Sequence, residues 1–242
     1  MSHFGLLGHP LSHSFSKTYF EKKFKDLDLS GYAYTLFDIK NAEDLAGFKS
    51  SNPFLSGLNV TIPYKEKVLP YLDGISEAAR SIGAVNTIKI MNGQWFGHNT
   101  DADGFKDSLI KWLAPFPQTA IILGNGGASK AVQFVLNELE ISFKVVSRSA
   151  SVNTIPYHEI TQVLVEKTDL IINTTPMGMY PNTELTPDFP MDFLNKQHAV
   201  YDLIYNPEQT LFLKLANQQG CKVKNGLEML YLQAEKSWEI WL

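Results

Sequence analysis

The chain has 242 residues, is 44% apolar and carries a formal net charge of −4. This size supports one large or two modest hydrophobic cores, and the scattered basic residues argue against nucleic acid and anionic membranes as partners. The single cysteine, Cys221, excludes an internal disulfide framework, and we find neither a signal-peptide pattern at residues 1–8 nor a stretch that approaches a membrane span. We therefore expect a globular cytoplasmic protein, monomeric or homodimeric, whose partner is a small molecule.

Residues 1–100 combine strand and helix patterns. Strands are expected at residues 4–7, 32–37 and 58–61, and helices at residues 16–24 and 41–48. Two further apolar segments, residues 84–90 and 95–98, flank Asn92-Gly93, a dipeptide typical of a tight β-hairpin. The hairpin is expected to bring Asn86 and Asn99 close together at its outer ends.

From residue 101 onward, helices and strands alternate. Helices are expected at residues 101–113, 129–139 and 208–219, and strands at residues 119–124, 142–147, 169–173, 199–203 and 221–224. Pro115 and Pro117 end the first of these helices, so we place a domain boundary near residue 101. The alternation predicts a parallel, doubly wound sheet.

Three polar segments punctuate the first half of the chain. Lys65 closes an apolar, turn-bound segment that runs from Asn59, and Asn86-Thr87 and Asn99-Thr100-Asp101 follow it. Asn and Thr side chains both donate and accept hydrogen bonds, and a lysine with an aspartate can transfer a proton, so the set suits a polyhydroxylated ligand. Taken singly, each segment is equally consistent with ordinary turn chemistry.

A glycine-rich turn, residues 124–129, lies between an expected buried strand and a helix. Glycines there allow a close approach to a phosphate, which the free N–H groups of the helix N-terminus bind. At the end of the next strand stands Ser147-Arg148-Ser149, where an NAD site would offer a carboxylate to the ribose. A guanidinium pairs with a 2′-phosphate, which favours NADP, although Arg148 is also consistent with a solvated surface residue.

These segments resemble the shikimate dehydrogenase family over nearly the whole chain. The matching motifs occur in order at residues 8–16, 59–65, 83–87, 99–101, 124–129, 173–178, 202–207 and 226–230 with Gln233. The resemblance implies a two-domain α/β fold with a substrate-binding domain at residues 1–100 and a Rossmann-like NADP domain at residues 101–225. It also implies a C-terminal helix at residues 226–242 that returns to the first domain, and NADPH-dependent reduction of 3-dehydroshikimate to shikimate.

Carried over by position, the family's substrate-binding residues are Ser14, Ser16, Thr61, Lys65, Asn86, Asp101, Tyr205 and Gln233, with Lys65 and Asp101 as the catalytic pair. The residues implied in cofactor binding are Gly124, Asn125, Gly126, Gly127, Ala128, Ser147, Arg148, Ser149, Thr174, Leu203, Gly226 and Glu77. The chain departs from the family at Lys17, where proline is usual, and at Asn125, where alanine is usual. It also lacks a second basic residue at positions 150–153, which weakens the preference for NADP.

Apolar spacing independently supports the last helix. Leu227, Leu230, Ala234, Trp238 and Trp241 form one expected stripe. Gln233 falls on a neighbouring face, from which it is expected to reach a ligand.

The chemistry expected of Lys65 follows from the reaction. A ketone that becomes a secondary alcohol needs a proton donor within about 3 Å of its oxygen. A lysine beside a carboxylate stays protonated, and Asp101 would orient the ammonium. The sequence does not separate a lysine that transfers the proton from one that acts only by its charge.

No metal is expected. His9 and His13 are four residues apart, but no third ligand accompanies them at a suitable spacing, and His13 is instead expected to order its loop. Cys221 is expected to be a small buried hydrophobic residue.

Two other functions remain open. A paralogue on the same scaffold would use quinate or NAD, and a broad substrate and cofactor screen would reveal it. A non-catalytic nucleotide-binding regulator would be expected to lose Lys65 or Asp101, and both are present.

Overall fold

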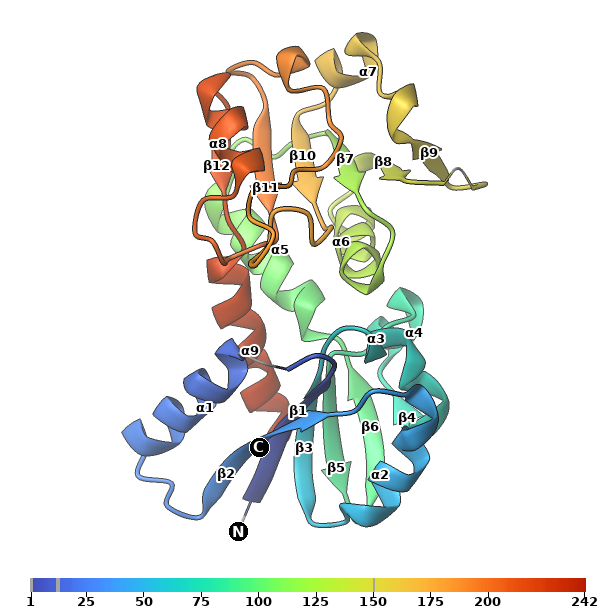
Figure 1. The fold of residues 1–242 in the computed structure, drawn as a ribbon, viewed down its shortest axis with the longest axis vertical. Coiled ribbons are helices and arrows are strands. Elements are labelled where there is room, and N and C mark those ends of the chain that lie inside the picture. The colour runs from blue at the N-terminus through green and yellow to red at the C-terminus, as the bar shows by residue number, and fades with distance from the viewer. Residues whose placement is uncertain (1, 12–13, 150) are drawn as a thin grey trace. The chain divides into compact units, whose positions relative to one another are not determined.

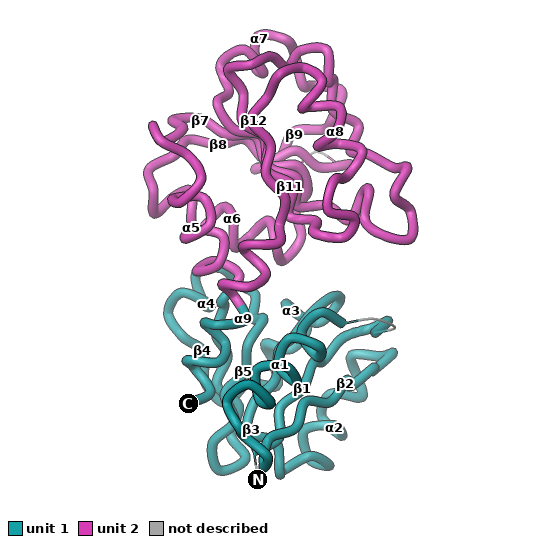
Figure 2. The backbone as a smooth tube through the Cα atoms, turned by 90° about the vertical axis from the view of Figure 1, so that its left-hand side faces the viewer, with its two compact units in different colours: residues 1–100, 234–242 teal, residues 101–233 magenta. Residues whose placement is uncertain are grey.

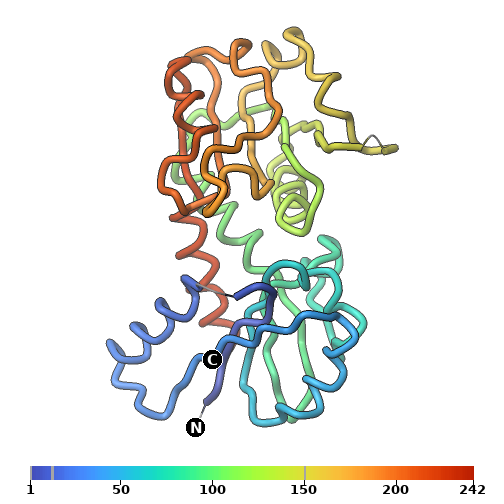
Figure 3. Tube along the Cα trace, viewed as in Figure 1, coloured from blue at the N-terminus to red at the C-terminus, as the bar shows by residue number. Residues whose placement is uncertain are grey.

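The structure is a computed structural model that describes residues 2–11, 14–149 and 151–242. The chain divides into two compact units (Figure 2): unit 1 comprises residues 1–100 and 234–242, and unit 2 comprises residues 101–233. Figure 3 follows the chain from unit 1 into unit 2 and back to unit 1 at its C-terminal end. Within the described residues, no helix is long and apolar enough to cross a membrane.

Unit 1 contains a six-stranded mixed sheet with the strand order β2-β1-β3-β5-β6-β4 (Figure 1). Its strands are β1 (Ser2–Gly8), β2 (Tyr32–Asp38), β3 (Leu55–Val60), β4 (Gly74–Ile75), β5 (Thr87–Met91) and β6 (Gln94–His98). β1 is parallel to β2 and β3, whereas β5 runs antiparallel to both β3 and β6.

Helices cover both faces of this sheet. They are α1 (Phe15–Asp26), α2 (Leu45–Ser51), α3 (Tyr64–Lys67) and α4 (Glu77–Ile82), with the short 3-10 helices η1 (Ala42–Asp44) and η2 (Leu69–Tyr71). Phe4 and Leu6 of β1 pack in a cluster with α1, while Leu7, the next residue, packs in a second cluster with α2, α3 and α4. Because successive side chains of a strand point to opposite faces, unit 1 has one core on each side of its sheet.

The expected hairpin is confirmed. β5 and β6 pair antiparallel with Met91 opposite Gln94, and both central residues, Asn92 and Gly93, have positive φ. Asn86 donates its backbone N–H to His98 at 3.1 Å, so the outer ends of the hairpin lie together as predicted.

Several predicted boundaries in unit 1 were wrong. The strand expected at residues 58–61 is β3 and begins three residues earlier, and the one expected at residues 84–90 begins only at Thr87. The helix expected at residues 41–48 starts as η1 and continues as α2 to Ser51.

Unit 2 contains the predicted parallel sheet, with the strand order β12-β11-β10-β7-β8-β9. Its strands are β7 (Thr119–Leu123), β8 (Ser142–Ser147), β9 (Thr154–Pro156), β10 (Leu170–Asn173), β11 (Ala199–Asp202) and β12 (Lys222–Lys224). Every neighbouring pair is parallel, as in a doubly wound sheet. β9 was not predicted.

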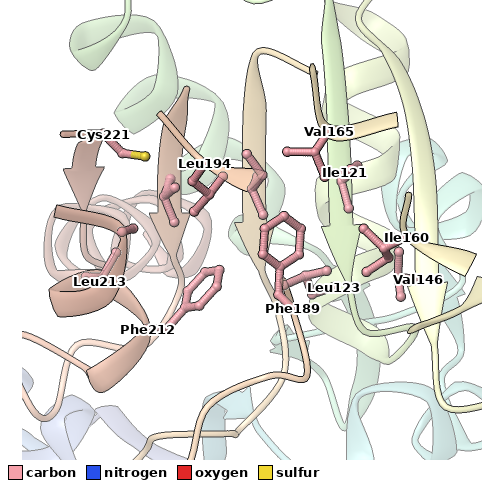
Figure 4. Close-up of a cluster of buried hydrophobic side chains, with 13 residues drawn as sticks. Ile121, Leu123, Val146, Ile160, Val165, Phe189, Leu194, Phe212, Leu213 and Cys221 are labelled. Carbon is pink, nitrogen blue, oxygen red and sulfur yellow. The ribbon is translucent and has the colours of Figure 1, made fainter. Parts of the chain in front are cut away.

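The helices of unit 2 are α5 (Thr100–Trp112, whose first residue belongs to unit 1), α6 (Gly127–Glu138), α7 (Gln162–Glu166) and α8 (Leu211–Gln218), with η3 (Tyr157–Glu159) and η4 (Met191–Phe193). On one face of the sheet, Ile121 and Leu123 pack with α7, α8 and Cys221 in a single cluster (Figure 4). On the other face, Tyr201 contacts Phe105 and Trp112 of α5, with ring centroids 5.4 and 5.6 Å apart. Cys221 is 5% exposed and is the small buried residue that we expected.

The last helix, α9 (Leu227–Trp241), begins in unit 2 and ends in unit 1. Ala234, Trp238 and Trp241 are buried as predicted, but Leu227 is 36% exposed, and the predicted stripe is wrong at its start. The buried residues there are Met229 and Gln233, because these pack against Gly104 of α5. A side chain at Gly104 would come within 2.7 Å of the Met229 carbonyl oxygen.

Candidate functional site

Lys65 lies in the short helix α3, and its backbone is fixed from two sides. Its carbonyl accepts a hydrogen bond from the N–H of Val85 at 2.7 Å. The preceding residue, Tyr64, is fully buried and donates its hydroxyl to the Ile39 carbonyl. Thr61, directly after β3, donates its N–H to the Leu7 carbonyl at 2.9 Å. These bonds hold the turn while the Lys65 side chain remains half-buried.

The two Asn-Thr segments form one buried hydrogen-bonded group. Asn86 is 3% exposed, its Nδ2 donates to Thr100 Oγ1 at 3.0 Å, and its Oδ1 accepts from the Thr100 N–H at 2.6 Å. Asn99 donates its Nδ2 to the Ala84 carbonyl at 2.9 Å. Asp101 follows Thr100 directly in the first turn of α5, where the helix dipole favours a carboxylate, and is 7% exposed.

A second layer of buried polar groups supports Asn86, and the sequence did not predict that Tyr34 and Ser237 belong to it. The Thr87 and Ser237 hydroxyls are 2.7 Å apart and lie 3.2 and 3.1 Å from that of Thr100. Asn59 Nδ2 donates to Ser237 at 3.0 Å, and Asn59 Oδ1 accepts from the Tyr34 hydroxyl at 2.7 Å. The one signal of this layer in the sequence was Asn59 itself, because a polar side chain within an apolar strand indicates a buried hydrogen bond.

The serine segment begins α1. Ser14 is the N-cap of this helix and accepts a hydrogen bond from the Lys17 N–H at 3.3 Å. Burial raises the pKa of Tyr34 well above its usual value, an effect that a hydrogen bond with Ser16 partly offsets. The neighbouring residues 12 and 13 lie outside the described residues, and so does the expected role of His13.

The glycine-rich turn of unit 2 has the geometry expected of a phosphate site. Gly124 has a φ of +105°, a backbone angle that residues other than glycine rarely adopt. Its N–H donates to the Val146 carbonyl at 2.8 Å. Gly126 is the N-cap of the twelve-residue helix α6 and has no side chain that would cap it. The free N–H groups of the first turn therefore remain available to an anion.

Thr174, Leu203 and Gly226 lie close to this turn or to one another. Thr174 Oγ1 donates to the Leu123 carbonyl at 2.7 Å. A Cβ built on Gly124 would lie 2.7 Å from this threonine Oγ1. Gly226 passes so near the Leu203 carbonyl that a Cβ there would lie 2.0 Å from its oxygen. The structure thus gathers four of the predicted cofactor residues at the carboxyl edge of the sheet in unit 2, where ligands of such sheets bind.

At the end of β8, Arg148 and Ser149 are exposed. Ser147 donates its hydroxyl to the Ser149 carbonyl and lies 3.3 Å from Thr154 Oγ1, which fixes the turn that presents Arg148. Arg148 is therefore presented on the surface of unit 2.

The remaining predicted residues are spread over both units. Burial raises the pKa of Tyr205, and Gln233 is 8% exposed with its Nε2 donating to the Leu230 carbonyl at 2.9 Å. Glu77 is exposed in the first turn of α4 and belongs to unit 1, whereas the other predicted cofactor residues belong to unit 2. Across the described residues, no group of three His, Cys, Asp or Glu side chains is placed to hold a metal ion.

Unit 2 has a parallel sheet with a glycine turn at a helix N-terminus, and unit 1 is a second α/β unit that carries a half-buried lysine and a group of buried amides and hydroxyls. These features are typical of a dinucleotide-dependent oxidoreductase. Residues 6–88 match the family model of the shikimate dehydrogenase substrate binding domain. This match, together with relatives that are 41% identical over nearly the whole chain, shows that the chain belongs to the shikimate dehydrogenase family.

Similar proteins cover nearly the whole chain. A shikimate dehydrogenase (NADP(+)) of Methanococcus maripaludis strain S2 is 41% identical over 255 residues, which cover 98% of this chain and 90% of that protein. A shikimate dehydrogenase (NADP(+)) of Clostridium beijerinckii is also 41% identical, and the alignment covers 100% of this chain and 92% of that protein. The fold is similar to the crystal structure of shikimate 5-dehydrogenase from Thermus thermophilus in complex with NADP(H) and shikimate, with a TM-score of 0.88. The two sequences are 32% identical, and the comparison covers 100% of this chain and 93% of that one.

Proposed function

We propose that this protein catalyses the NADPH-dependent, reversible reduction of 3-dehydroshikimate to shikimate. The single observation that carries the proposal is the similarity, over nearly the full length, to proteins named shikimate dehydrogenase (NADP(+)). The polar residues of unit 1 and the glycine turn of unit 2 support it, because the first suit a polyhydroxylated acid and the second a dinucleotide.

The residues of unit 2 fit the cofactor. Gly124 and Gly226 stand where a Cβ would collide with Thr174 and with the Leu203 carbonyl, so the two glycines allow the loops at this edge of the sheet to pack closely on one another. The N-terminus of α6 offers N–H groups to the pyrophosphate, and Arg148 offers its guanidinium to a 2′-phosphate. When bound, NADPH supplies the hydride.

The substrate is held, in this proposal, mainly by unit 1. Ser14 and Ser16 bind its carboxylate, and Thr61 and Asn86 bind its hydroxyls together with Tyr205 and Gln233. Lys65 donates a proton to the carbonyl oxygen, and Asp101 orients the ammonium group. In the reverse direction the neutral amine of Lys65 accepts the proton from the alcohol.

A matrix assay tests the function. Purified protein is given shikimate or quinate with NADP⁺ or NAD⁺, and the absorbance of the reduced cofactor is followed. We expect turnover with shikimate and NADP⁺ to exceed the other three combinations by about tenfold or more in kcat/KM, which corresponds to about 1.4 kcal/mol of discrimination. Turnover only with quinate and NAD⁺ would contradict both the substrate and the cofactor.

We also infer a cytoplasmic protein that is a monomer or a homodimer. Cell fractionation and sedimentation of the purified protein test these two predictions.

A further inference from the structure

A buried amide and a buried carboxylate join two strands of unit 2 at the edge where the cofactor residues lie. Asn173 and Asp202 are the last residues of β10 and β11 and stand opposite each other in the sheet. Neither side chain is exposed, and Asn173 Nδ2 donates to Asp202 Oδ1 at 2.9 Å. The pair therefore spans the two strands at the point where each one leads into a loop.

Asn173 fixes the first of these loops, residues 174–177. Its Oδ1 accepts from the N–H of Thr175 at 3.0 Å and from the Thr175 hydroxyl at 2.7 Å. The same hydroxyl accepts from the Met177 N–H at 3.2 Å. Thr174 is thereby held beside Gly124, the first residue of the glycine turn.

Asp202 fixes the second loop, residues 203–210, at both ends. Its Oδ1 accepts from the Ile204 N–H at 3.0 Å, and its Oδ2 accepts from Thr210 Oγ1 at 2.6 Å. Thr210 also begins α8 by accepting from the Leu213 N–H at 3.2 Å. In addition, the Ile204 carbonyl accepts from the Gly226 N–H at 3.0 Å, so the loop is tied to Gly226 as well.

A carboxylate suits this position for a physical reason. Burying a charge is costly unless its oxygens are hydrogen-bonded, and three neutral donors satisfy Asp202, one from Asn173 at the end of β10 and two from the loop of residues 203–210. Burial raises the pKa of Asp202 to about 6, so the group is still mostly ionised at neutral pH and accepts from all three donors at once. An apolar residue would leave these donors unsatisfied.

We propose that Asn173 and Asp202 are positioning residues for the cofactor, which hold residues 174–177 and 203–210 in the conformation that binds the dinucleotide beside Gly124. This inference rests on the proposed function, in which these loops bind NADP. The two residues act through Thr174, Leu203 and Gly226 and need not touch the cofactor themselves.

The test measures NADP⁺ binding by calorimetry without any substrate, at a temperature where all variants are folded. Three variants are compared with wild type: Asp202→Ala, Asp202→Asn and Thr210→Val. Of these, Asp202→Asn keeps Oδ1 as a hydrogen-bond acceptor. The matched control is Thr168→Val, because Thr168 is also buried and donates its hydroxyl to the Leu164 carbonyl at 2.8 Å, before the amino end of β10. Thermal unfolding of each protein measures the loss of stability separately.

We expect the dissociation constant of NADP⁺ to rise about tenfold or more in Asp202→Ala and about threefold or more in Thr210→Val. Asp202→Asn should stay within about threefold of wild type, and Thr168→Val should bind as wild type does although it is destabilised. The inference is overturned if Asp202→Ala and Thr210→Val bind NADP⁺ within about twofold of wild type, or if Thr168→Val weakens binding as much as Thr210→Val. If Asp202→Ala does not fold, the two valine variants decide. A wild-type protein that binds no NADP⁺ would instead contradict the proposed function.

Discussion

The carboxyl group of Asp202 should make the stability of this protein depend on pH in a way that one substitution removes. Burial raises its pKa from the usual 3.8 to about 6, although hydrogen bonds from Thr210, Ile204 and Asn173 act in the opposite direction. The folded protein therefore holds this proton more tightly than the unfolded chain does. The resulting stabilisation is fully present below about pH 4 and is lost as the pH rises through about 6. A shift of this size corresponds to about 3 kcal/mol, at 1.36 kcal/mol for each pKa unit.

Asp202→Asn provides the comparison, because its amide cannot titrate while its Oδ1 still accepts from Asn173 and Ile204. Urea unfolding of both proteins, followed by circular dichroism from pH 4 to pH 7, gives the difference in their free energies of unfolding. We expect wild type to lose up to about 3 kcal/mol relative to the variant between these two pH values, since all other groups titrate alike in both proteins. A difference that stays constant within about 0.5 kcal/mol, or that changes in favour of wild type as the pH rises, would refute the reasoning.

Three further predictions concern single residues. Gly226→Ala places a Cβ 2.0 Å from the Leu203 carbonyl oxygen, so it should lower the free energy of unfolding by about 1–3 kcal/mol and weaken NADP⁺ binding. Thermal melts measure the first effect and calorimetry the second. A melting temperature equal to that of wild type would contradict this prediction. Arg148→Ala should raise the KM for NADP⁺ about tenfold and leave the KM for NAD⁺ unchanged, because the guanidinium meets only the 2′-phosphate. Steady-state assays with the two cofactors measure both constants. Equal effects on NADP⁺ and NAD⁺ would argue against pairing of Arg148 with the 2′-phosphate. Burial raises the pKa of the Cys221 thiol to about 11, so at pH 8 this group should react with a thiol reagent only after urea is added, and rapid reaction of the folded protein would disprove it.

The sequence was most informative where an apolar run is long and its ends are marked by turns. Ile121 and Ile122 lie in such a run, and the strand expected there is β7 within one residue. β4 and β9 have two and three residues, too few for any period to show, and neither was predicted. The start of α8 was placed three residues too early, because Thr210 caps the helix while it also bonds to Asp202.

Contacts between distant segments explain the other errors. The exposed Leu227 was expected in the buried stripe of α9, but the close approach of α5 at Gly104 turns Met229 inward instead. The link between Asn59 and Ser237 depends on the packing of α9 against β3, which no local pattern reveals.

The candidate site was predicted unevenly for a similar reason. The glycine turn carries its own local signal. The role of Tyr205 came only from family resemblance, and that of Gln233 came from the resemblance together with the helical spacing of residues 226–242; both stay predictions. The pairing of Asn173 with Asp202 requires the register of β10 on β11, which only the folded sheet supplies.

The most direct test of the central claim is the steady-state rate of NADP⁺ reduction by shikimate, measured for wild type and Lys65→Ala side by side. Lys67→Ala is the control, because Lys67 lies on the same helix α3 and is exposed. We predict turnover by wild type and the control, and a kcat about two orders of magnitude lower or more in Lys65→Ala with a KM for shikimate within about threefold of wild type, as for a group that acts mainly in the transition state. An inactive wild type, or a Lys65→Ala protein with an unchanged kcat, would contradict the account.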